Sequence, residues 1–119
     1  MMLSHRILLG ALCAAAGAAA AAAPYELSLN AERRGDSVSI APTVVAAPGK
    51  RLRYEIEARK DGASSSRSQQ AGEVTIGAEG RAVLSHMSFS AGPRERCEIS
   101  VRVFEAGRLV ASQSTGCTP

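Results

Sequence analysis

The stretch Arg51-Leu52-Arg53-Tyr54-Glu55-Ile56-Glu57-Ala58-Arg59 alternates strictly between charged and apolar residues. Successive side chains of a β-strand point to opposite faces, so this pattern predicts a strand with one buried face and one charged face. A helix would distribute the same charges around its whole circumference. The stretch Arg96-Cys97-Glu98-Ile99-Ser100-Val101-Arg102-Val103 repeats the pattern. Two such strands indicate an antiparallel sheet that has one face in the core and the other in water.

The N-terminal segment has the composition of a signal peptide. Residues 1–6 are short and basic, residues 7–12 are apolar, and an alanine tract follows them. Ala20-Ala21-Ala22 fits the A-x-A cleavage rule, with cleavage before Ala23. A retained membrane anchor is the alternative, but the apolar run consists mostly of alanine and a proline follows it. We therefore expect a cleaved signal peptide at residues 1–22, export to the periplasm, and one mature domain at residues 23–119.

The mature chain is small and nearly balanced in charge. It keeps about 97 residues, which is enough for one sandwich domain. The formal charge falls from +3 to +2 when Arg6 is removed. A nucleic-acid-binding domain would concentrate its basic residues in a patch, and two tyrosines and two phenylalanines are too few for platforms that stack bases. We therefore expect no nucleic-acid partner.

Two cysteines, Cys97 and Cys117, remain after cleavage, because Cys13 lies in the signal peptide. In an oxidising compartment an even pair favours a disulfide. Closing a loop of about 20 residues would stabilise the fold by roughly 3 kcal/mol in the chain-entropy model. A redox-active pair is the alternative, but it normally needs a close spacing such as C-x-x-C. We therefore predict a structural disulfide between Cys97 and Cys117.

Alternation and turn signals predict about seven short strands and no helix. The expected strands cover residues 25–33, 37–47, 51–59, 73–76, 81–90, 94–105 and 108–114. Pro42 predicts a bulge or an edge position in the second strand, because proline cannot donate to a ladder. Residues 63–70 are polar and fit either a loop or a weak edge strand. The pattern is typical of an immunoglobulin-like antiparallel β-sandwich, with a small Greek-key barrel as the alternative.

The same alternation predicts which side chains of two less regular strands face the core. In the second strand these are Val38, Ile40 and Val44. In residues 81–90 they are Val83, Met87 and Phe89, or else Leu84.

No constellation of residues points to catalysis or to a metal. The mature chain has one histidine, His86, and a triad with Asp36 or Asp61 would still lack a nucleophile elbow. The sequence contains no H-x-H, C-x-x-C or acidic loop motif that would gather metal ligands, and no glycine-rich phosphate loop. We therefore expect a protein that is not an enzyme and that holds neither a cofactor nor a metal.

The outer face of the two amphipathic strands is the remaining candidate site. The third and sixth strands are neighbours in an immunoglobulin-like order, so their charges would meet on this face. Its basic residues are Arg51, Arg53, Arg59, Arg96 and Arg102. One interpretation is a solvated lattice of cross-strand ion pairs, each worth under ~1 kcal/mol. The other is a surface whose electrostatic field engages a partner transiently.

Three segments resemble the CsgH family of alphaproteobacterial curli assembly inhibitors, which are functional relatives of the CsgC proteins. These segments are Leu27–Ser39, Gly49–Ala58 and Cys97–Ala111. The resemblance implies a periplasmic immunoglobulin-like protein that keeps the secreted curli subunit from forming amyloid before it reaches the cell surface. CsgC proteins contain a Cys-x-Cys pair, but Glu98 and Ile99 follow Cys97 here, so the resemblance does not extend to a redox role.

The resemblance favours the partner-binding interpretation of the charged strands. We expect their five arginines to make weak, transient contacts with the unfolded curli major subunit, so that a monomeric, chaperone-like protein prevents premature amyloid polymerisation. Once the signal peptide is removed, no membrane contact is expected. A passive exported structural or adhesive domain without an amyloid client is the alternative function. A protease inhibitor that presents residues 64–70 is a third.

Overall fold

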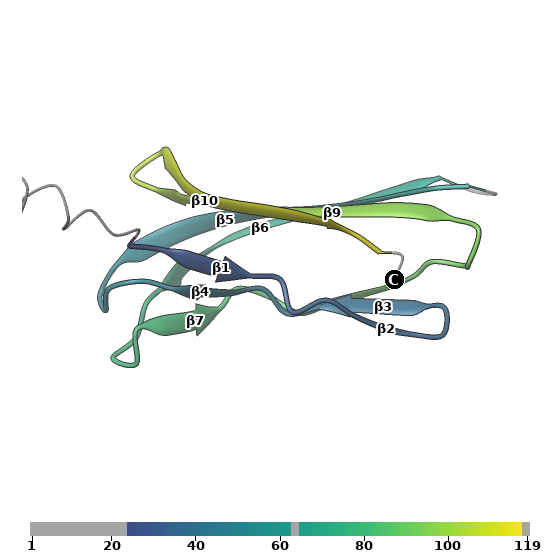
Figure 1. Cartoon of the computed structure of the whole chain (residues 1–119). Helices are drawn as coiled ribbons and strands as arrows, with labels where there is room; N and C mark the ends of the chain where they lie inside the picture. The colour runs from purple at the N-terminus through teal and green to yellow at the C-terminus, as the bar shows by residue number, and fades with distance from the viewer. Residues whose placement is uncertain (1–23, 63–64, 118–119) are drawn as a thin grey trace, which may run out of the picture.

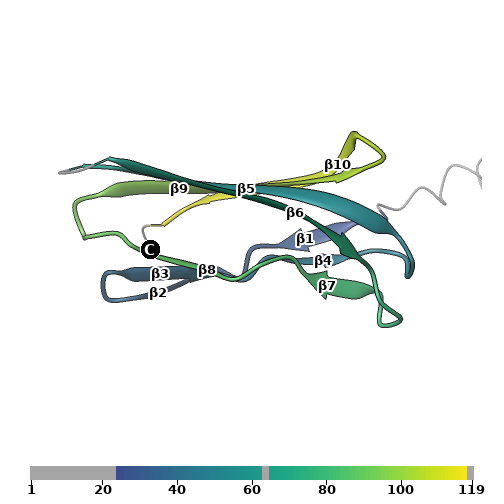
Figure 2. The same ribbon diagram turned by 180° about the vertical axis from the view of Figure 1, so that it is seen from behind.

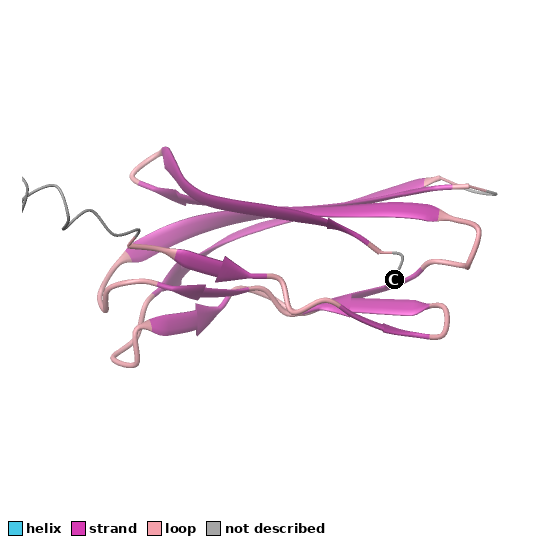
Figure 3. Ribbon diagram, viewed as in Figure 1, coloured by secondary structure: helices cyan, strands magenta, loops and turns pink. Residues whose placement is uncertain are grey.

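The computed structural model describes residues 24–62 and 65–117, and the predicted signal peptide at residues 1–22 lies outside these ranges. Its elements are all strands (Figure 3). They are β1 Glu26–Ser28, β2 Glu32–Arg34, β3 Ser37–Ile40, β4 Thr43–Val45, β5 Arg51–Asp61, β6 Ser66–Thr75, β7 Arg81–Val83, β8 Met87–Ser90, β9 Arg96–Glu105 and β10 Arg108–Gly116. The described part of the chain contains no helix that is long and apolar enough to cross a membrane.

Two layers of antiparallel strands form a sandwich (Figures 1 and 2). One layer is a four-stranded sheet in the order β10-β9-β5-β6, and the other consists of two three-stranded sheets, β1-β4-β7 and β2-β3-β8. These two sheets lie end to end: β1 continues into β2, β3 into β4, and β7 into β8 along the same direction (Figure 2). If each interrupted strand is counted once, the sandwich has seven strands, and the predicted all-β sandwich is confirmed.

The structure corrects three predicted strands by interrupting each of them; these are residues 25–33, 37–47 and 81–90. In the first, Asn30 has a φ of 52°, which is left-handed and incompatible with a continuous strand. Backbone hydrogen bonds connect the interruptions: the Ala41 N–H donates to Leu29 O (3.2 Å) and the Leu84 N–H donates to Pro42 O (2.8 Å). The predicted disruption at Pro42 is confirmed, but its strand is central in the sheet, so the edge alternative is wrong.

Strand β6 confirms the edge-strand alternative for the polar segment and corrects the extent of the predicted strand that follows it. The sequence of residues 63–70 fits either a loop or a weak edge strand, and residues 73–76 are expected to form a separate short strand. The structure instead has one edge strand, Ser66–Thr75, which pairs with β5 without a register shift. Gly72 of β6 lies opposite Tyr54, and a Cβ atom at position 72 would lie 2.6 Å from the Tyr54 hydroxyl oxygen. Glycine is required there because the tyrosine ring occupies the space of a side chain.

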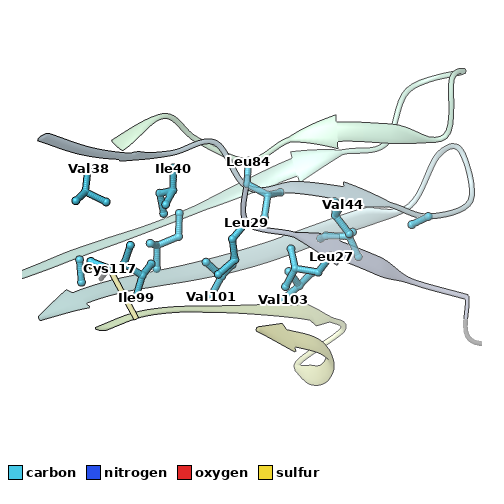
Figure 4. Close-up of a cluster of buried hydrophobic side chains, with 14 of the residues drawn as sticks. Leu27, Leu29, Val38, Ile40, Val44, Leu84, Ile99, Val101, Val103 and Cys117 are labelled. Atoms are coloured by element: carbon cyan, nitrogen blue, oxygen red, sulfur yellow. The ribbon is translucent and has the colours of Figure 1, made fainter. Parts of the chain in front are cut away.

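The core lies between the two layers (Figure 4). Ile99, Val101 and Val103 point inward from β9 and are fully buried. They pack with buried residues of the opposite layer, among them the predicted inward residues Val38, Ile40 and Val44. Burying each such aliphatic side chain contributes about 1.5–3 kcal/mol. The inward faces of both layers therefore supply the main stabilisation of the fold.

The predicted strand at residues 81–90 is interrupted, and this changes which side chains of the segment face the core. Leu84 is buried, and Met87 and Phe89 are partly buried against the core. Val83 faces outward and is 48% exposed, which corrects its predicted core position. The segment between β7 and β8 shifts the alternation, so members of both predicted sets reach the core.

The predicted disulfide joins Cys97 of β9 to Cys117, which directly follows β10 (Cα–Cα 5.1 Å). The Cys117 N–H also donates to Cys97 O (3.1 Å), so the cross-link joins neighbouring strands of one sheet. Arg33 of β2 connects this point to the other layer. Its guanidinium donates to Cys117 O (3.1 Å) and to Ala91 O (2.5 Å).

Candidate functional site

The outward side chains of β5, β6 and β9 form one surface, which we call the charged face. Strands β5 and β9 pair antiparallel, with Glu55 opposite Arg102 and Arg59 opposite Glu98. Directly opposite residues of neighbouring strands lie on the same face of a sheet. The predicted proximity of these two strands is therefore confirmed, and all five predicted basic residues lie on the charged face. They are Arg51, Arg53 and Arg59 of β5, and Arg96 and Arg102 of β9.

Glu55 is shared by two arginines at one end of the charged face. One carboxylate oxygen accepts a hydrogen bond from Arg102 (2.6 Å), and the other accepts one from Arg53 (3.4 Å). One negative charge therefore neutralises only one of two positive charges. Nearby, Arg51 Nε lies 3.9 Å from Glu73 Oε1. All of these side chains are at least one-third exposed, so each ion pair contributes only about 0–1 kcal/mol.

Arg59 and Arg96 lie at the other end of the charged face. Glu98 and Asp61 are their neighbours across the β5–β9 ladder. Among residues 24–62 and 65–117, however, neither arginine lies within 4.0 Å of a carboxylate oxygen. The six positions from Arg53 to Arg59 correspond to about 20 Å along a strand. The predicted arginines thus form two separate groups, one with acidic partners and one without.

The charged face has mixed charge. Its basic residues are the five predicted arginines and Arg67 of β6, and its acidic residues are Glu55, Glu57, Asp61, Glu73 and Glu98. The positive charges exceed the negative charges by one. Arg67 pairs with Glu57 (2.5 Å). The sequence does not predict the place of Arg67 on the charged face, because residues 63–70 show no apolar alternation. The surface is therefore a lattice of opposite charges with a small positive excess.

Phe104 and Leu109 add an apolar spot that the sequence analysis missed. Phe104 of β9 lies opposite both Arg53 of β5 and Leu109 of β10, and Leu109 is 54% exposed. The guanidinium carbon of Arg102 lies 5.8 Å from the Phe104 ring centroid, within the range of a cation–π interaction. Phe104 continues the outward series that begins at Arg96, so the alternation of β9 could have identified it. An apolar spot bordered by guanidinium groups suits a partner with neighbouring apolar and acidic side chains.

The described residues contain no cluster of three or more histidine, cysteine or acidic side chains that could hold a metal. His86 is exposed in the segment between β7 and β8. It lies in the layer of two three-stranded sheets, whereas the charged face belongs to the four-stranded sheet.

Comparisons with known proteins find a matching family and six similar chains among solved structures, including CsgC and CsgH. The family described as Tafi-CsgC, thin aggregative fimbriae synthesis protein, matches residues 18–115. The E. coli curli protein CsgC is 28% identical, with a TM-score of 0.57 over 76% of this chain and 96% of CsgC. R. palustris CsgH is 20% identical, with a TM-score of 0.55 over 77% of this chain and 89% of CsgH, a likeness of fold alone. No curated protein sequence matches the chain.

Proposed function

The chain belongs to the Tafi-CsgC family of thin aggregative fimbriae synthesis proteins, and we propose that it prevents premature amyloid polymerisation of curli subunits. The family is one of curli assembly proteins and not of enzymes. Within it, we place the chain beside the CsgH proteins, since Glu98 and Ile99 follow Cys97 where CsgC proteins have a Cys-x-Cys pair. The acting form is the monomeric domain at residues 23–119, in the periplasm, after removal of the signal peptide at residues 1–22.

The observation that supports this proposal is the arrangement of the charged face. Its ion pairs are exposed, so each is worth only about 0–1 kcal/mol and can exchange partners at little cost. A carboxylate of an unfolded subunit can replace Glu55 beside Arg53, or Glu73 beside Arg51. Complementary charge increases the rate of encounter more than it increases affinity. The contact therefore forms fast and dissociates fast, which suits a protein that must release its client for secretion.

Thioflavin fluorescence of a purified curli subunit tests the inhibitor function. With this protein added well below equimolar, the lag phase should lengthen several-fold, because the inhibitor acts on rare early species or on growing ends. An unchanged lag at every ratio would reject the proposal. The passive exported structural or adhesive domain would then be the better description.

A charge-reversal pair tests the role of the charged face in the same assay. The double variant Arg51→Glu/Arg53→Glu should lose most of the lag extension, because it replaces attraction of acidic client segments by repulsion. The matched control is Arg34→Glu/Arg81→Glu, which changes the net charge equally on exposed residues of the other layer. A folded Arg51→Glu/Arg53→Glu protein that inhibits as well as the control would exclude the charged face.

A further inference from the structure

The edges of the sandwich differ in how they are protected. An exposed edge strand presents unpaired N–H and C=O groups, and natural sheets block such edges with bulges, interruptions, proline or charge. Here the four edges are β6 and β10 in one layer, and β1 with β2 and β7 with β8 in the other. Each of them is a possible place for a further strand to pair.

Two of the four edges are interrupted, and a third contains an irregularity in its pairing. Asn30, with its left-handed φ, separates β1 from β2, and residues 84–86 separate β7 from β8. Strand β10 has a register shift between Leu109 and Ala111. Strand β1 also contacts β10, and the disulfide at Cys117 fixes the other end of that edge. An added strand would find segments of three or four residues on the two interrupted edges, and on β10 the continuous register is limited to Ala111–Gly116.

Strand β6 is the exception among the described edges. Its ten residues pair with β5 in continuous register, and they include neither proline nor lysine. Its two charged residues are Arg67 and Glu73, and each has a partner on β5: Glu57 at 2.5 Å and Arg51 at 3.9 Å. The edge therefore lacks the usual features that prevent a further strand from pairing.

One hydrogen bond identifies which backbone groups of β6 face the free edge of the sheet. The Ile76 N–H donates to Lys50 O (2.8 Å), and in an antiparallel ladder such groups alternate between the partner strand and the free side. Val74, Gly72, Gln70 and Ser68 accordingly direct their N–H and C=O groups to β5. The residues that direct theirs to the free edge are Arg67, Gln69, Ala71, Glu73 and Thr75.

We propose that β6 is a docking edge on which an unfolded amyloid-forming chain pairs as an additional strand. This rests on the proposed function and adds a second contact to the charged face. Serine and glutamine dominate the first half of β6, at Ser66, Ser68, Gln69 and Gln70. Hydroxyl and amide side chains pair well with their own kind across stacked strands. The client segment is therefore an extended one that is rich in serine, threonine, asparagine and glutamine.

Pairing with β6 interferes with polymerisation for a geometric reason. An interior strand of a cross-β sheet needs amyloid strands on both of its sides, in a flat stack. A segment on β6 has one side occupied by a twisted sandwich sheet, which does not offer that flat, in-register partner. The segment is withdrawn from the fibril for as long as it stays bound.

The variant Ala71→Pro tests the docking edge without changing any charge. The Ala71 N–H faces the free side, so proline removes a donor for an added strand and leaves the β5–β6 ladder intact. The matched control is Ser114→Pro on β10. The Cys117 N–H donates to Cys97 O of β9. The N–H groups of β10 alternate in the same way, so the Ser114 N–H faces the free edge of that strand. We expect Ser114→Pro to lengthen the thioflavin lag as wild type does, and Ala71→Pro to lose at least half of that extension.

Amide hydrogen exchange of the wild-type protein is the second test, and it does not depend on whether a variant folds. Addition of freshly unfolded curli subunit should slow exchange at Gln69, Ala71 and Glu73 several-fold. Unchanged exchange there, or full inhibition by folded Ala71→Pro, would overturn the docking edge while leaving the inhibitor function standing. Protection of these amides in the protein alone, rising with its concentration, would show a second copy on β6 and also overturn the proposal.

Discussion

At the scale of single residues, the charged face is organised around Glu55. This carboxylate accepts hydrogen bonds from Arg53 and Arg102 at once, and Arg102 also lies over the Phe104 ring. These contacts orient the two arginines, while about half of each side chain stays exposed. Glu55 limits the positive charge of this end, and it competes with any client carboxylate for the same two guanidinium groups.

The variant Glu55→Gln separates these roles. It removes one negative charge and the competitor, so we expect the thioflavin lag at low salt to be longer than with wild type, by about two-fold or less. The free energy of unfolding in urea should fall by under ~1 kcal/mol, because the lost ion pairs are exposed. Glu26→Gln, an equal charge change on β1 of the other layer, is the control. A lag shorter than wild type would mean that Glu55 itself contacts the client.

At the scale of elements, the end of β10 is held at two points. The disulfide joins Cys117 to Cys97 of β9, and Arg33 of β2 donates to Cys117 O and to the carbonyl of the fully buried Ala91. The first contact lies within one layer and the second crosses between layers. Their shared residue, Cys117, makes them energetically dependent on each other.

We expect the variant Arg33→Ala to lower the free energy of unfolding by about 1–3 kcal/mol, because buried carbonyls lose their donor. The double variant Cys97→Ala/Cys117→Ala should lower it by about 3 kcal/mol, the value for a loop of this length. In that double variant, adding Arg33→Ala should lower the free energy of unfolding by less than Arg33→Ala lowers it in the wild-type protein. Urea denaturation of the four proteins measures this coupling. Strictly additive losses would show that Arg33 acts independently of the cross-link.

The elements also differ in how well the sequence predicts them. The predicted strands at residues 51–59 and 94–105 correspond to β5, Arg51–Asp61, and β9, Arg96–Glu105. Their apolar and charged residues alternate strongly, so a shift of one residue would bury a row of charges. Strand β6 has polar residues on both faces, and such a segment contains no periodic signal. The interruptions depend on local backbone conformation, such as the positive φ of Asn30, which alternation does not encode.

For the candidate site, the sequence predicts which residues share the charged face but not which of them form ion pairs. Alternation assigns the five arginines to one face, and the family expected from the CsgC-like resemblance is confirmed. The ion pairs were not predictable, because they depend on the register between strands. Sliding β9 by two residues would keep every charge on the same face, yet it would replace Arg102 opposite Glu55 by another residue. In the observed register Ile99, Val101 and Val103 are fully buried in the core.

At the scale of the whole molecule, the proposed contacts act over different distances. The charged face attracts a client through an electrostatic field, which extends about 10 Å at 0.1 M salt and about 3 Å at 1 M. Pairing on β6 uses backbone hydrogen bonds, which form only at contact and respond weakly to salt. The two sites are adjacent, because β6 pairs directly with β5, whose arginines belong to the charged face. A client attracted by the face is therefore already beside the edge.

This arrangement predicts how inhibition depends on salt. The lag extension, normalised to the subunit alone at each salt concentration, should fall for wild type between 0.05 M and 0.5 M and then level off. Arg51→Glu/Arg53→Glu should show little salt dependence, because its attraction is already lost. Ala71→Pro should show the same salt dependence as wild type but a lower plateau, because its edge no longer pairs. If both variants lost the salt dependence equally, capture by the face and pairing on the edge would be a single process rather than two successive ones.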